Sequence, residues 1–158
     1  MKHSLKRGFS FGLASGIITT LGLMVGLNSA TSSRFVVLGG ILTIAIADAL
    51  SDALGMHVSV EFSGVRSFKH IWEATFATFF SKFFFALTFA VPVLLFSLPA
   101  AILINIVWGF FLLSVFSFFV AKKQNIAPWK AVFEHLIIAV IVIIATYYVG
   151  RFVALYFV

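Results

Sequence analysis

The sequence predicts an all-α membrane protein with five transmembrane helices. Of its 158 residues, 62% are hydrophobic and only 10% are charged, whereas soluble domains are about half apolar and about a quarter charged. Five apolar segments of spanning length follow one another with short polar connections. They are continuously apolar and do not alternate with polar residues, which argues against a membrane β-barrel. We therefore expect a single transmembrane domain over residues 1–158.

The five segments differ in their charged residues. The first and fourth carry none, the second contains two aspartates, the third contains Lys82 and Pro92, and the fifth is charged only near its ends. Because proline lacks the backbone N–H that a helix needs, Pro92 is expected to kink the third helix. The helices are expected at about residues 9–29, 35–59, 74–98, 100–120 and 131–156.

The first apolar segment follows a basic N-terminus, as in a signal peptide. It is longer than a typical signal core, and Asn28 and Ala30 make a poor cleavage site. We expect a first helix that is retained. The chain has no cysteine, which excludes disulfides and thiolate metal ligands.

The basic residues predict the orientation of the helices. Eight of the 11 Lys and Arg residues precede the first helix or lie in the connections after the second and fourth helices, while Arg34 and Arg151 lie towards the other side. Cytoplasmic loops are enriched in Lys and Arg, so the N-terminus is expected in the cytoplasm and the C-terminus outside. The same bias accounts for the net charge of +6 without nucleic-acid binding. The eight residues are Lys2, Lys6, Arg7, Arg66, Lys69, Lys122, Lys123 and Lys130.

The first segment carries small residues at a helical period. Gly8, Gly12 and Gly16 recur every four residues, and small residues at this spacing let two helices approach closely in lipid. Ser15 and Thr19 share another face and are candidates for lining a polar path through the membrane.

The second segment contains "ADALSDALGM" (47–56), in which Asp48, Asp52 and Met56 form one stripe bordered by Ser51. A single carboxylate at the bilayer centre costs at least about 2.5–3.5 kcal/mol, so protonation, a partner Lys or a bound cation must offset it. Lys82 is the nearby basic residue, and snorkelling to the headgroups is favoured over pairing with an aspartate. One Lys cannot neutralise two carboxylates, whereas a divalent cation can.

The residue types indicate which ion the stripe would hold. Carboxylates suit Mg²⁺, Ca²⁺ or Mn²⁺, and a Met thioether shifts the preference towards Fe²⁺. Asp48, Asp52 and Met56 are therefore candidate metal ligands, with Ser15, Thr19 and Ser51 lining the path. Two alternatives stay open: the acids could form a proton relay, and Met56 could simply pack in the core.

Three stretches resemble the vacuolar iron transporter family. "GLASGIITTLGLMVGLNSA" (12–30) is similar to that family's first helix, "ALSDALGMHVSV" (49–60) to the end of its second, and "APWKAVFEHLIIAVIVIIATYYVGRF" (127–152) to its last. The resemblance implies the same five-helix plan and a homodimeric exporter of Fe²⁺ or Mn²⁺ that exchanges the metal for protons. The ion path of the family runs along a dimer interface of helices 1 and 2, where Gly12 and Gly16 would pack.

The sequence departs from the family pattern at the ligands. Ser15 stands at the position of the first-helix Asp, and the long cytoplasmic metal-binding insert is missing. An acid and a Met eight residues apart recur as Asp48 and Met56, but the best local register places Asp52 at the family's Met and Ile44 at its Glu. The two possible alignments to the family thus differ by four residues, which shifts the expected ligands by one helical turn along the same stripe.

The expected function is export of a divalent transition metal, Fe²⁺ or Mn²⁺, from the cytosol. The alternatives are a non-transporting membrane anchor or partner subunit, and a proton-coupled carrier of another small ion. No nucleophile–base constellation, HExxH motif or phosphate loop indicates an enzyme. The protein is expected as a homodimer in the cell membrane of a prokaryote or a vacuole-like membrane of a eukaryote.

Overall fold

The computed structural model describes residues 3–64 and 67–157, and this part of the chain contains helices and no strand. Five of its helical stretches are long and apolar enough to cross a membrane, which confirms the predicted fold class. In chain order the elements are α1 (His3–Thr31), α2 (Arg34–Thr43), the π-helical turn η1 (Ile44–Asp48), α3 (Ala49–Phe62), α4 (Phe68–Thr88), α5 (Ala90–Leu95), α6 (Leu98–Lys123) and α7 (Pro128–Tyr156). Lys2 and Arg66, counted among the basic residues, lie outside the described residues.

Most helices extend beyond the apolar segments that predicted them. α1 already begins at His3 and α6 ends at Lys123, because polar and basic residues at headgroup depth remain helical although they lower the hydropathy. The third span is the exception and ends at Leu95, three residues before the expected end. Leu98 instead begins α6, where a proline occupies the first turn and Ala101 N–H donates to Ser97 O at 2.8 Å.

The expected kink at Pro92 is confirmed as a break between α4 and α5 at Phe89. The break frees backbone groups inside the bundle, and Asn105 of α6 donates its Nδ2–H to the carbonyl of Phe89 at 2.9 Å. Such a side-chain bond satisfies a backbone carbonyl at an irregular point of a membrane helix, where the bilayer offers no water.

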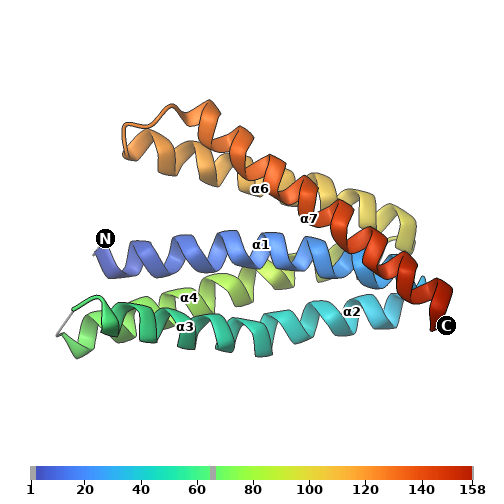
Figure 1. The fold of residues 1–158 in the computed structure, drawn as a ribbon, viewed down its shortest axis with the longest axis horizontal. Helices are drawn as coiled ribbons and strands as arrows, with labels where there is room; N and C mark the ends of the chain where they lie inside the picture. The colour runs from blue at the N-terminus through green and yellow to red at the C-terminus, as the bar shows by residue number, and fades with distance from the viewer. Residues whose placement is uncertain (1–2, 65–66, 158) are drawn as a thin grey trace.

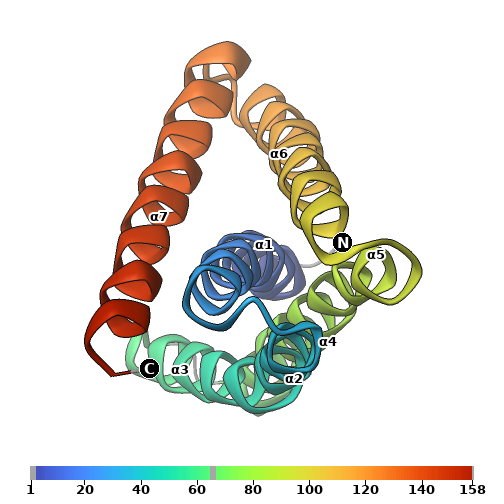
Figure 2. The ribbon, with the colours of Figure 1, turned by 90° about the vertical axis from the view of Figure 1, so that its right-hand side faces the viewer.

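The central helix of the bundle is α1, with the other spans arranged around it (Figure 2). Its glycines meet the backbone of α4: a Cβ at Gly8 would overlap the Ala74 carbonyl, and one at Gly12 would overlap the Thr78 carbonyl. A Cβ at Gly16 would lie 3.2 Å from the Cα of Lys82. The expected dimer packing through Gly12 and Gly16 therefore needs correction, since both glycines are buried against α4 of the same chain.

The second half of α1 packs against α7 in the same way. Gly22 faces Val142, Gly26 faces Thr146, and Gly150 of α7 lies against the Gly26 carbonyl. Both ends of the glycine pattern are thus used inside one chain, because a central helix must accept neighbours on several sides at short distance.

One end of the bundle collects the basic residues. The start of α1, the end of α3, the start of α4 and the α6–α7 turn lie together at this end (Figure 1). We call it the basic end, and it carries Lys69, Lys122 and Lys123. Arg34 and Arg151 lie towards the other end. The arrangement agrees with the loop assignment that underlies the predicted topology, and the orientation in the membrane stays a prediction.

Candidate cation site in the membrane

The second span changes its helical geometry just before its acidic residues. α2 gives way to the π-helical turn η1, which ends at Asp48, and α3 then carries Asp52 one turn later. A π-helical turn inserts an extra residue into the helix and is frequent at functional sites. The two carboxylates therefore follow a local irregularity deep in the span, which the hydrophobic pattern alone did not predict.

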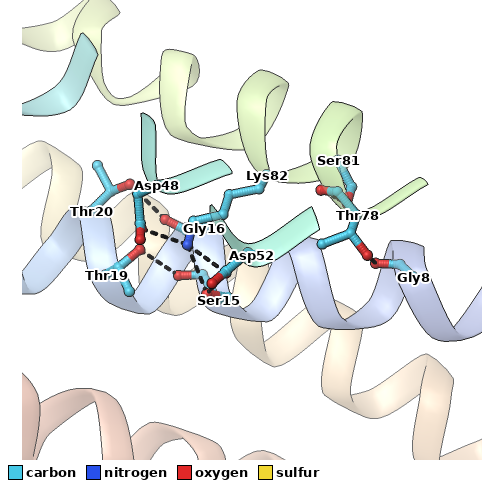
Figure 3. Close-up of polar contacts among 10 residues, drawn as sticks. All are labelled: Gly8, Ser15, Gly16, Thr19, Thr20, Asp48, Asp52, Thr78, Ser81 and Lys82. Carbon is cyan, nitrogen blue, oxygen red and sulfur yellow. Dashed lines mark hydrogen bonds and ion pairs between the residues drawn. The ribbon is translucent and has the colours of Figure 1, made fainter. Parts of the chain in front are cut away.

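The ammonium of Lys82, from α4, lies between both carboxylates (Figure 3). Nζ is 2.5 Å from Oδ2 of Asp48 and 2.6 Å from Oδ2 of Asp52. Its third partner is the hydroxyl of Ser15, at 3.0 Å. An ammonium has three donors, so each donor of Lys82 has a partner. We call Asp48, Asp52 and Lys82 the charge triad.

Residues of α1 complete the surroundings of the triad. Ser15 Oγ donates to Asp52 Oδ2 at 2.6 Å, while it accepts from Lys82. Gly16 gives Lys82 room, because its missing side chain lets the backbone of α4 approach α1 at this level. The hydroxyl of Thr19 donates to the carbonyl of Ser15 at 2.7 Å, so its hydrogen bond lies within α1.

The members of the triad differ in their exposure. The side chain of Lys82 is fully buried, whereas those of Asp48 and Asp52 are 38% and 22% exposed. The two carboxylates and one ammonium also leave one negative charge uncompensated. The two acids thus lie at the outer face of the second span, while Lys82 is buried behind them.

Snorkelling, the favoured interpretation of Lys82, is wrong. Its side chain is enclosed between α1, α3 and α4 and ends at the carboxylates. The sequence signal was present, since Lys82 is the one Lys or Arg in the middle of an apolar segment and a lone intramembrane charge usually pairs. Hydropathy gave its approximate depth but not the face of the helix it occupies.

The structure brings together only part of the predicted site. Met56 is buried in an apolar cluster with Val60, Ile71 and Ala74, so it is placed for packing and needs correction as a candidate ligand. Ser51 is exposed beside the triad. Among residues 3–64 and 67–157, no group of three or more His, Asp or Glu side chains is placed to hold a metal ion. The candidate ligand set is therefore the pair Asp48 and Asp52.

Further polar contacts lie towards the basic end. Glu73 accepts from Ser4 Oγ at 2.9 Å and contacts His70 Nδ1 at 3.0 Å. His57 Nδ1 is 3.0 Å from the Thr75 hydroxyl. These contacts join α1, α3 and α4 between the triad and the basic end. They satisfy polar groups whose burial in a helix interface without a hydrogen bond would be unfavourable.

The chain matches no model of a known protein family and has no significant match among curated proteins. The resemblance to vacuolar iron transporters therefore stays a prediction.

Proposed function

We propose that the protein is a secondary transporter that exports a divalent transition metal, Fe²⁺ or Mn²⁺, in exchange for protons. The observation that supports this function is the placement of Asp48 and Asp52 around one positive charge inside the membrane. Carboxylates are suitable ligands for divalent ions such as Mn²⁺, and here two of them converge on one cation. The ammonium of Lys82 marks the point on which they converge.

Lys82 then holds the site when no metal is present. A metal ion that binds both carboxylates must take the position of the ammonium, because two cations cannot share one position between the same oxygens. Lys82 would turn aside as the ion binds and return when it leaves. Without Lys82, two like charges would face each other one helical turn apart with nothing to separate them.

The expected homodimer is proposed through the second span alone. Small residues recur there at every fourth position and all are exposed to the outside of the bundle. A Cβ at Gly39 or Gly55 would meet nothing within 4 Å. We call these residues the small-residue stripe: Gly39, Thr43, Ala47, Ser51, Gly55 and Ser59.

A second copy on this stripe would complete the site. Small residues permit close approach of two helices in lipid, and their hydroxyls can bond across the contact. The stripe runs beside Asp48 and Asp52, so the partner would shield the exposed carboxylates from lipid. A two-fold axis along it would bring two triads together.

Transport into proteoliposomes tests this function. The purified full-length chain should carry Fe²⁺ or Mn²⁺ in a panel of divalent ions, and metal flux should be accompanied by opposite proton flux. The variant Asp52→Asn should carry neither metal. The control Glu134→Gln removes one carboxylate from an exposed position on α7 and should transport like the wild type.

The same triad also favours one alternative, a non-transporting membrane module. All donors of Lys82 are satisfied, so the triad could serve folding alone. Absence of metal flux from the wild type, with Asp52→Asn destabilised, would favour that alternative. Proton flux without any metal would instead favour the proton-coupled carrier.

A further inference from the structure

One face of α4 carries a continuous series of aromatic rings, which we call the aromatic ladder. Neighbouring ring centroids are 5.9, 5.2, 6.4 and 6.3 Å apart from the first ring to the last. The five rings are at least one-third exposed. The ladder consists of Phe68, Trp72, Phe76, Phe80 and Phe84.

The ladder forms one wall of a groove between α4 and the first turns of α1. Leu5 and Phe9 form the opposite wall, and Ala77 also lines the groove, whose volume is about 670 Å³. At 1.5 Å per residue the ladder runs about 24 Å along the helix, more than the roughly 15 Å of hydrocarbon in one leaflet. The groove is therefore long enough to take an acyl chain through its whole leaflet.

A cation stands where the groove reaches the basic end. Lys69 lines the groove one turn from Glu73 and has no ion pair with a described residue. Glu73 is engaged by Ser4 and His70. Trp72 adds an amphipathic ring of the kind that favours headgroup depth.

We propose that this groove binds an anionic phospholipid, with one acyl chain along the aromatic ladder and the headgroup phosphate at Lys69. The apolar walls match the acyl chain, and Lys69 supplies the complementary charge at the level where the phosphate lies. The groove does not include any residue of the charge triad. The lipid-binding proposal therefore does not depend on metal transport.

Quenching of Trp72 fluorescence by brominated acyl chains tests the site. The chain has three tryptophans, so replacing Trp108 and Trp129 by Phe leaves Trp72 as the reporter in the detergent-purified protein. Brominated phosphatidylglycerol should bind roughly fivefold more tightly than brominated phosphatidylcholine with the same chains, the factor that corresponds to about 1 kcal/mol for one Lys beside an anionic surface.

Three variants in that background decide the assignment. Lys69→Gln should quench with both lipids but lose the preference for phosphatidylglycerol. Lys130→Gln removes the same charge from the first turn of α7, outside the groove, and should keep the preference. Ala77→Phe fills the groove and should weaken quenching by both lipids. Equal affinity of the wild type for the two lipids, or a preference that survives Lys69→Gln, would overturn the proposal. So would quenching that Ala77→Phe leaves unchanged.

Discussion

The ammonium of Lys82 lies 2.6 Å from a carboxylate oxygen of Asp52, although the two residues belong to different membrane spans. This contact joins α4 to α3 in the apolar interior, and Ser15 of α1 bonds to both partners. Three helices therefore meet at one polar point. The charge triad at this point has two carboxylates and one ammonium. This excess of negative charge is the basis of the first two predictions.

Asp52→Asn should fold as stably as the wild type and lose metal transport. The amide keeps nearly the same shape and can still accept from Ser15 or Lys82, while Asp48 continues to pair with the ammonium. Replacing one of two carboxylates that share a single ammonium by a neutral isostere is often neutral or stabilising. Thermal unfolding in detergent and proteoliposome flux at equal protein level measure the two effects. Full flux through Asp52→Asn contradicts the metal-path proposal.

Lys82→Met should lower the melting temperature of the protein, because it removes the buried ammonium and leaves two partly exposed carboxylates of like charge one helical turn apart. The metal-site proposal adds a second expectation: Mn²⁺ should raise the melting temperature of this variant more than that of the wild type, since the ion takes the place of the ammonium. Adding Asp52→Asn to Lys82→Met should remove the effect of Mn²⁺. Stabilisation by Mn²⁺ that survives this double change would place the binding site elsewhere.

Gly55→Leu should weaken the proposed homodimer without unfolding the protomer. A Cβ at Gly55 meets nothing within 4 Å in the chain, whereas one at Gly12 would overlap the Thr78 carbonyl. The comparison variant Gly12→Leu should therefore lower the melting temperature itself. Size-exclusion chromatography with light scattering reports the dimer. A wild type that is monomeric, or a Gly55→Leu dimer of unchanged stability, would exclude this interface.

Met56→Leu should leave both stability and metal preference nearly unchanged. Met56 packs with Val60 and Ile71 in an apolar cluster, and volume-conserving apolar exchanges usually cost less than about 1.5 kcal/mol. Competition between Fe²⁺ and Mn²⁺ in the flux assay measures the preference. A shift towards Mn²⁺ would restore the sulfur as a ligand and contradict its placement in the core.

A reporter that is active only in the cytoplasm should give no signal when fused after Val158. The basic end then faces the cytoplasm, as expected from the bias of Lys and Arg. The same reporter inserted after Gln124, in the α6–α7 turn, should be active and serves as the control. The opposite pair of signals would reverse the orientation of all five spans.

Much of the site was contained in the local sequence. The spacing of Asp48 and Asp52 placed both acids on one stripe of the second span, and the structure keeps them adjacent. Met56 lies on the same stripe in sequence but packs against α4. The period of a helix gives the face of each residue, yet it cannot say which neighbouring helix covers that face. The structure therefore keeps the two acids of the expected ligand set together and places Met56 in a separate apolar cluster.

The sequence by itself determined the five helices of spanning length, the helix break preceding Pro92 and the close packing of the first helix. These follow from hydropathy, from the missing N–H of proline and from glycines at every fourth position, all properties of single segments. Only the tertiary structure decided that Gly12 and Gly16 pack against α4 and that Lys82 pairs with the acids. Those outcomes depend on the rotation of each helix about its own axis. In the membrane, lipid is as apolar as the helix interface, so hydrophobicity does not decide which face of a helix turns inward. The rotation is set instead by close packing and by the pairing of buried polar groups.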